Sequence, residues 1–114
     1  MTRQPNIRIN QVNTLVLSKS LVNALELLPD RVYPFFAYHC DDSIDIMILP
    51  ECYFTGCWFT ADINPKTPSS YRFKAGRGEA LANIFAIRGF KKLTNYKVSK
   101  IVPKTSFSIT KEEI

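Results

Sequence analysis

The chain has 114 residues, enough for one domain whose core needs neither metal nor disulfides. Its apolar share of 46% and charged share of 22% are those of an ordinary soluble globular protein. No apolar run approaches the ~20 residues of a membrane helix, and residues 1–11 lack the apolar segment of a secretory signal. The three cysteines, an odd number, fit a reducing compartment better than a disulfide framework. We therefore expect a single cytoplasmic domain over residues 1–114, with no membrane partner.

The net charge of +5 is unevenly distributed along the chain. Residues 1–60 carry a net charge of −2, and residues 61–114 carry +7. Such asymmetry indicates a polyanionic partner for the second half, most often a nucleic acid. A lysine-rich surface that is simply solvated explains the same numbers equally well, because a basic patch alone is a weak signal.

The first half predicts a strand, a helix and a hairpin after a polar segment. Residues 1–13 are polar and we expect a flexible arm there, with a short edge strand at Ile7–Val12 as the alternative. Thr14–Leu17 is apolar and β-prone, which predicts a strand. Apolar residues at helical spacing predict a helix over 19–28, with Ser18 as its N-cap.

Two further strands are predicted after this helix. Residues 31–38 predict a strand at a sheet edge or a bulge, because Pro34 cannot donate a hydrogen bond to a neighbour. A turn follows at 41–43. Isoleucines at 44, 46 and 48 alternate with other residues and predict a strand with one buried face.

The segment TLVLSKSLVNALELLPDRV at 14–32, followed by a hairpin ending in IDIMILP at 44–50, resembles the AbrB-like swapped-hairpin family. That family includes bacterial transition-state regulators, many antitoxins and MraZ-type proteins. The resemblance implies a small β-rich fold and, for many members, DNA binding in transcription regulation. Members that bind DNA usually carry a Gly-Arg pair before the first strand, where this chain has Gln11, Val12 and Asn13. The family's proline before the helix is Ser18 here, so the resemblance supports the fold more than DNA contact by the first half.

The middle of the chain joins an aromatic segment to a linker. Residues 51–60 are rich in aromatic side chains, which we interpret as core residues rather than as an exposed platform for stacking bases. Gly56 indicates a bulge or a bend. Turn-forming prolines and serines predict a linker over 61–70.

The second half predicts a basic strand, helix and strand. Residues 71–74 alternate aromatic and basic side chains, which predicts a strand with two different faces. A helix is predicted from near Glu79 to a stop at Gly89. Strands over 95–102 and 106–110 follow, and residues 111–114 form a tail.

This second half has the order of the first, with LVNAL at 21–25 aligned by eye with LANIF at 81–85. MraZ-like proteins build a pseudo-dimer from two copies of the swapped-hairpin unit within one chain. The resemblance therefore implies an internal duplication, with repeat units at 14–50 and 71–102. Any amphipathic helix rich in leucine and alanine would align about as well.

The glycine-bearing turn at 75–78 is a candidate site for a phosphate of DNA or RNA. Glycines let backbone amides approach an anion, and a helix start adds a partial positive charge. Arg77 would contact a phosphate through two hydrogen bonds. A plain connecting turn explains the same residues, and the motif lacks the further residues of a P-loop or a dinucleotide fingerprint. We expect no cofactor.

Metal and catalytic sites are not expected. His39, Cys40, Cys52 and Cys57 lack the paired-cysteine spacing of a zinc site. His39 is the one histidine, and no nucleophile motif accompanies it. The carboxylates at 41, 42 and 45 are typical of a solvated turn. We predict a protein that is not an enzyme.

Together these patterns predict an α+β fold: a β-rich domain with two short helices on a small sheet or pseudo-barrel of six to eight strands. The predicted function is that of a small nucleic-acid-binding protein, a regulator or accessory factor that binds DNA rather than RNA. The alternative is an interaction module for an acidic protein. An exposed edge at the Pro34 strand would allow a homodimer. The predicted nucleic-acid-binding residues are Arg72, Lys74, Arg77, Arg88, Lys91, Lys92 and Lys97.

Overall fold

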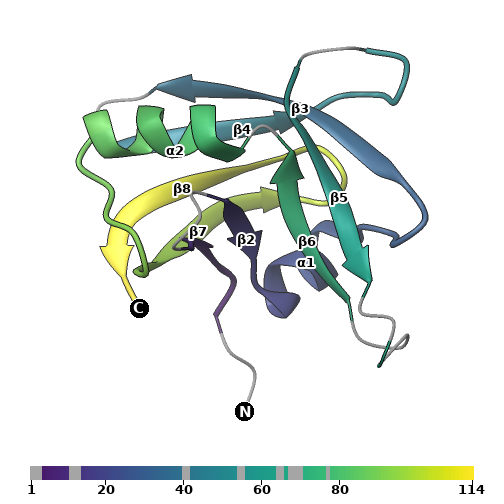
Figure 1. The fold of residues 1–114 in the computed structure, drawn as a ribbon, viewed down its shortest axis with the longest axis horizontal. Coiled ribbons are helices and arrows are strands. Elements are labelled where there is room, and N and C mark those ends of the chain that lie inside the picture. Colours follow the sequence, from purple (N-terminus) through teal and green to yellow (C-terminus); the bar gives the residue numbers. More distant parts are fainter. Residues whose placement is uncertain are drawn as a thin grey trace.

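Eight antiparallel strands form one closed barrel in the computed structural model, in the order β1-β2-β6-β5-β3-β4-β8-β7 (Figure 1). The model describes residues 4–10, 14–39, 42–53, 56–63, 66, 71–76 and 78–114. The strands are β1 (Asn6–Ile9), β2 (Leu15–Leu17), β3 (Val32–His39), β4 (Ser43–Ile48), β5 (Trp58–Ile63), β6 (Tyr71–Gly76), β7 (Asn95–Val102) and β8 (Ser106–Glu113).

The predicted α+β class is wrong, because this closed sheet makes the domain essentially all-β. Helix α1 (Lys19–Leu25) has seven residues, about two turns. Helix α2 (Gly78–Ile87), with ten residues, is the longer of the two described helices. Both connect strands of the barrel instead of forming a layer of their own, and they lie at separate places on it (Figure 1).

Alternating side chains fill much of the barrel interior, although β8 buries three residues in succession, Phe107, Ser108 and Ile109. On β4, Ile44 and Ile46 are buried, whereas Met47 between Ile46 and Ile48 is exposed. Aromatic rings from distant strands meet inside: Phe35 stacks on Phe59 with ring centroids 4.0 Å apart. Burial of apolar area of this kind is the main favourable term in folding. The interpretation of the aromatic segment as core is confirmed at Phe59, while Tyr53 is exposed.

Where the structure describes 1–13, the predicted flexible arm is wrong; a strand is present, as in the alternative from Ile7, but it is not at an edge. Residues 6–9 form β1, which pairs with β2 on one side and β7 on the other. Ile7 and Ile9 are almost fully buried. The predicted tail at 111–114 is likewise mostly strand, since β8 runs to Glu113.

The edge predicted at Pro34 does not exist, because β3 has a partner on each side. Its ladder to β5 ends at the pair Pro34–Trp58, and its ladder to β4 begins at the pair Phe35–Ile48. Pro34 therefore lies where the strand changes partner, and its carbonyl accepts from the Leu49 N–H at 2.8 Å. Because β3 has no exposed edge at Pro34, this strand gives no argument for a homodimer.

The ladders divide the chain into two equivalent halves, β1-β2-α1-β3-β4 and β5-β6-α2-β7-β8. Each half consists of two hairpins that do not pair with one another. Hairpin β3–β4 pairs with β5 and β8 of the second half, and hairpin β7–β8 pairs with β1 and β4 of the first. Exchanging the two halves reproduces the same set of neighbours around the barrel.

The helix C-terminal ends of the two halves also match in their hydrogen bonds. Glu26 ends α1 with a φ of 57°, and Gly89 ends α2 with a φ of 89°. The next residue in each case, Leu27 or Phe90, is buried and donates its N–H back to the helix. A buried tyrosine then accepts from the following amide. The equivalent positions, always 63 residues apart, are Val22 and Phe85, Asn23 and Ala86, Glu26 and Gly89, Leu27 and Phe90, Leu28 and Lys91, and Tyr33 and Tyr96.

This match predicts equal effects of removing either tyrosine hydroxyl. Tyr33 accepts from the Leu28 N–H at 2.8 Å, and Tyr96 accepts from the Lys91 N–H at 2.5 Å. Tyr33→Phe and Tyr96→Phe should each lower the free energy of unfolding by about 1 kcal/mol, because an amide loses its partner. Chemical denaturation measures both. Tyr38→Phe, at an exposed ring, is the control and should change stability by less than ~0.5 kcal/mol.

A second prediction concerns the pair Gly76–Trp58 between β6 and β5. A Cβ added to Gly76 would lie 2.2 Å from the Trp58 ring. Gly76→Ala should therefore destabilise the fold by about 1–3 kcal/mol through overpacking. The same substitution in a Trp58→Leu background should cost much less, and a double-mutant cycle measures the difference. Equal costs in both backgrounds would contradict this contact.

Candidate nucleic-acid interface

Three of the predicted binding residues lie together at the C-terminal end of α2. Arg88, Lys91 and Lys92 are all exposed in the turn between α2 and β7. Lys111 of β8 joins them, with its ammonium 5.9 Å from the centroid of the Phe90 ring. The negative end of a helix dipole favours cations at this place. We call these four residues the α2-end cluster.

This turn is held firmly against the barrel. The Leu93 N–H donates to the Ile9 carbonyl of β1 at 2.7 Å, and the Lys91 N–H donates to Tyr96. The Phe90 ring packs edge-on against Tyr96, with centroids 4.8 Å apart. The backbone that carries the α2-end cluster is therefore fixed, and its long side chains project from a rigid base.

A second group of bases lies on the outer face of four neighbouring strands, β6, β2, β1 and β7. Residues directly opposite one another in a ladder point to the same face. Arg8 lies opposite Val16 and Asn95, and Val16 lies opposite Lys74, so Arg8 and Lys74 are two strands apart on one face. At the spacing of neighbouring strands, their backbones are about 10 Å apart. We call this surface the basic face; its bases are Arg8, Arg72, Lys74 and Lys97.

The basic face and the α2-end cluster adjoin. The turn that carries Lys91 and Lys92 leads directly into Asn95, which pairs with Arg8. The structure thus brings together bases that are far apart in sequence. Arg8 was missed as a site residue because the segment around it was interpreted as an arm, and Lys111 because it was assigned to a tail.

Two of the predicted binding residues are engaged in ion pairs with acids on neighbouring strands. Lys74 Nζ lies 2.7 Å from Asp62, and Lys97 Nζ lies 3.7 Å from Glu112. The hydrogen bond from Lys74, followed by its charge, lowers the pKa of Asp62. Exposed pairs of this kind contribute little to stability. They do reduce the charge that Lys74 and Lys97 offer a polyanion.

The candidate phosphate turn at 75–78 is only partly described. Arg77 lies outside the described residues. Gly76 is the last residue of β6, and the space above its Cα is filled by the Trp58 ring. Gly76 therefore has a packing role: because it lacks a Cβ, the Trp58 ring of the neighbouring strand can lie against its backbone.

The other candidate groups lie apart from this surface or outside the described residues. Cys40 and Asp41 lie outside them, and His39 ends β3. Cys52 is exposed and Cys57 is half-buried. Asp45 accepts a hydrogen bond from Ser108 Oγ at 2.7 Å. Among the described residues, no group of three His, Cys, Asp or Glu side chains could hold a metal ion.

Comparison with models of known families, with curated proteins and with solved structures finds no match to this chain. In the part of the chain that the structure describes, neither helix has the length and apolar character needed to span a membrane.

The ion pair on the basic face predicts a measurable titration. Lys74→Met should raise the pKa of Asp62 toward its ordinary value, because the bound ammonium is lost. A lowered pKa in the folded protein means that the pair stabilises above the pKa of the unfolded carboxyl, and that this stability is lost as the pH falls through the folded value. Carboxyl NMR titration measures the shift. Lys97→Met should leave Asp62 unchanged.

Proposed function

We propose that this protein is a small non-enzymatic nucleic-acid-binding protein, a DNA-binding regulator or accessory factor. The observation that supports the proposal is the gathering of bases from β1, β6 and the α2–β7 turn on adjoining surfaces. Arg8, Arg72, Arg88, Lys91 and Lys92 make no ion pair with any acid of the described chain. Clustered cations of this kind bind a phosphate backbone by releasing its counterions.

The arrangement of the two halves supports a place for the chain among AbrB-like swapped-hairpin proteins as part of this proposal. The segments β2-α1-β3-β4 and β6-α2-β7-β8 correspond in order, and each ends in a hairpin that pairs with the other half. We infer an internal duplication whose units extend beyond 14–50 and 71–102 to include β1 and β5. The copies then differ in charge, and the second supplies most of the bases.

The bases come from hydrogen-bonded neighbouring strands and from a turn held by hydrogen bonds, and such a fixed arrangement suits the regular phosphate spacing of a duplex, so we favour DNA over single-stranded RNA as the partner. Contacts would go mainly to phosphates, which position a protein without reading sequence. A DNA-binding role, together with the odd number of three cysteines, also favours a cytoplasmic location.

The test is binding of a labelled random-sequence duplex, measured by fluorescence anisotropy between about 50 and 200 mM salt. Lys91→Ala with Lys92→Ala should weaken binding and reduce the slope of log affinity against log salt by up to about 2, or about 0.9 per lost phosphate contact. Arg8→Gln should act in the same direction. Lys19→Ala with Lys66→Ala, two exposed lysines elsewhere, removes the same charge and should have a much smaller effect.

Absence of duplex binding at the lowest salt would refute the proposal. Equal weakening by both double variants would show attraction by total charge alone and would refute this interface. Polyglutamate serves as a competitor. If it displaces DNA at equal charge concentration, the interaction module for an acidic protein becomes the better explanation.

A further inference from the structure

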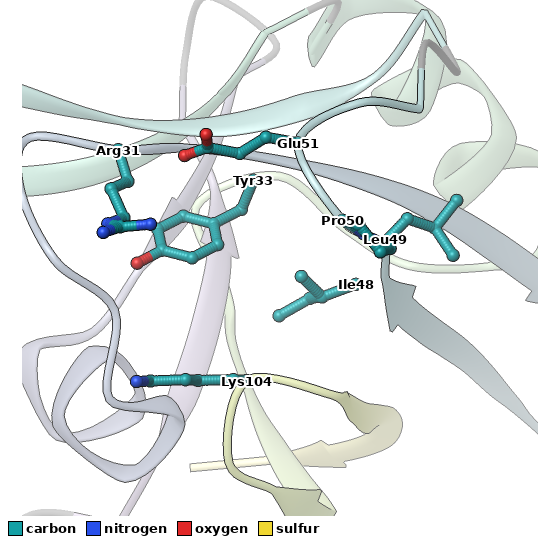
Figure 2. A pocket seen from close by; sticks show the side chains of 7 residues that line it. All are labelled: Arg31, Tyr33, Ile48, Leu49, Pro50, Glu51 and Lys104. Atoms are coloured by element: carbon teal, nitrogen blue, oxygen red, sulfur yellow. The ribbon is translucent and has the colours of Figure 1, made fainter.

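A pocket of about 390 Å³ is lined mostly by residues of the first half and is completed by Lys104 of the second, so that three parts of the chain form it. It includes the α1–β3 connection, the end of β4 with the turn after it, and the turn between β7 and β8. Its volume is in the range of small-molecule sites. Its lining residues, shown in Figure 2, are Arg31, Tyr33, Ile48, Leu49, Pro50, Glu51 and Lys104.

Backbone hydrogen bonds fix the walls of this pocket. The Lys104 N–H donates to the Leu25 carbonyl at the end of α1 at 2.9 Å, and the Ile48 N–H donates to the Thr105 carbonyl at 2.7 Å. The Leu49 N–H donates to Pro34 at 2.8 Å. These bonds join the three segments to one another, so the backbone around the pocket is preorganised, and a ligand would need to order only the exposed side chains that reach it.

Three donors face the pocket and have no acceptor among the described residues. The Tyr33 oxygen already accepts from the Leu28 N–H, which leaves its own proton for another partner. Arg31 and Lys104 form no ion pair with the described acids. In Figure 2 the guanidinium, the ammonium and the hydroxyl lie on the same side of the pocket, with Ile48 opposite them.

The fold itself does not require a cation at position 31. In the second half, the position equivalent to Arg31 is Thr94, 63 residues later, although the equivalent tyrosine, Tyr96, makes the same hydrogen bond to an amide. Arg31 therefore adds a charge that closure of the barrel does not need. Both halves have the tyrosine that accepts a hydrogen bond from the amide after the helix, whereas only the first half has a cation, Arg31, at the neighbouring position.

We infer that this pocket binds a small organic monocarboxylate with an apolar body. The carboxylate would accept from Arg31, Lys104 and the Tyr33 hydroxyl, and the body would lie on Ile48, Leu49 and Pro50. Glu51 also lines the pocket, so the three charged side chains sum to +1 and favour a single negative charge over a phosphate dianion. This inference does not depend on nucleic-acid binding.

The test uses benzoate as the probe and follows amide NMR signals during titration of the full chain. Saturable shifts should appear at Leu28, Ile48, Leu49 and Lys104. Arg31→Gln with Lys104→Gln should weaken binding by about tenfold or more, since two charge-assisted hydrogen bonds are lost. Glu51→Gln should strengthen binding, which a purely structural role of Glu51 would not produce. Lys19→Gln with Lys66→Gln is the control of equal charge and should leave the benzoate affinity within about twofold of the unsubstituted protein.

Two further probes separate this site from simpler explanations. Benzyl alcohol that binds as tightly as benzoate would show an apolar hollow with no role for the cations. Inorganic phosphate that binds as tightly would show general attraction of anions. Either result would overturn the inference. So would NMR shifts that do not saturate, or a benzoate affinity that Arg31→Gln with Lys104→Gln leaves unchanged.

Discussion

The structure depends on ladders between the two halves of the chain. Within each half the two hairpins share no ladder, and four of the eight ladders, β1–β7, β2–β6, β3–β5 and β4–β8, join one half to the other. Neither half has a closed hydrogen-bonded surface of its own. A half alone would leave strand edges and the apolar interior exposed to water, which is unfavourable for both. Closure of the barrel therefore stabilises every other feature, including the turn that carries the α2-end cluster.

Local sequence pattern located most strands but could not assign their partners. Alternation along 44–48 and 95–102 predicted β4 and β7 closely, because each strand buries one face. Strand β1 was predicted only as an alternative and as an edge, because Ile7 and Ile9 are two apolar residues among polar ones, and one of its partner strands, β7, lies about 90 residues away. Pro34 predicted an edge because a missing N–H usually needs one; here the strand changes partner at that residue. These are effects of tertiary pairing, which a single sequence does not display.

Because a single sequence does not display tertiary pairing, the alignment of the two halves from sequence was also out of register. The sequence aligned Leu21 with Leu81 by apolar pattern, whereas the helix ends align Val22 with Phe85. The sequence alignment is therefore three residues out of register with the structure. In the structure Glu26 is equivalent to Gly89, since both have a positive φ after their helix, and a glutamate gives no sign of that conformation in the sequence. A tyrosine that accepts from an amide five residues earlier is a better marker of the repeat than the helix itself.

For the candidate interface, the sequence supplied the bases and the barrel supplied their arrangement. Arg88, Lys91 and Lys92 are neighbours in the chain, so their grouping was predictable. Asp62 with Lys74, and Glu112 with Lys97, meet across strands, and their mutual neutralisation followed only from the register. Arg8 joins the basic face for the same reason. The net charges of the two halves thus predicted a polyanionic partner. They did not predict which basic side chains are free of ion pairs with neighbouring acids and can contact that partner.

The ladder between β1 and β7 has a consequence for synthesis of the chain. Asn6 pairs with Lys97, so β1 has no lasting partner on that side until residues 95–97 have left the ribosome. Hairpins β1–β2 and β3–β4 would emerge early with open edges and apolar faces. Contacts between such distant residues slow folding, and open edges favour association with other chains in the interval. The barrel is therefore expected to close only after β7 has been synthesised, and its open edges need protection from other chains until then.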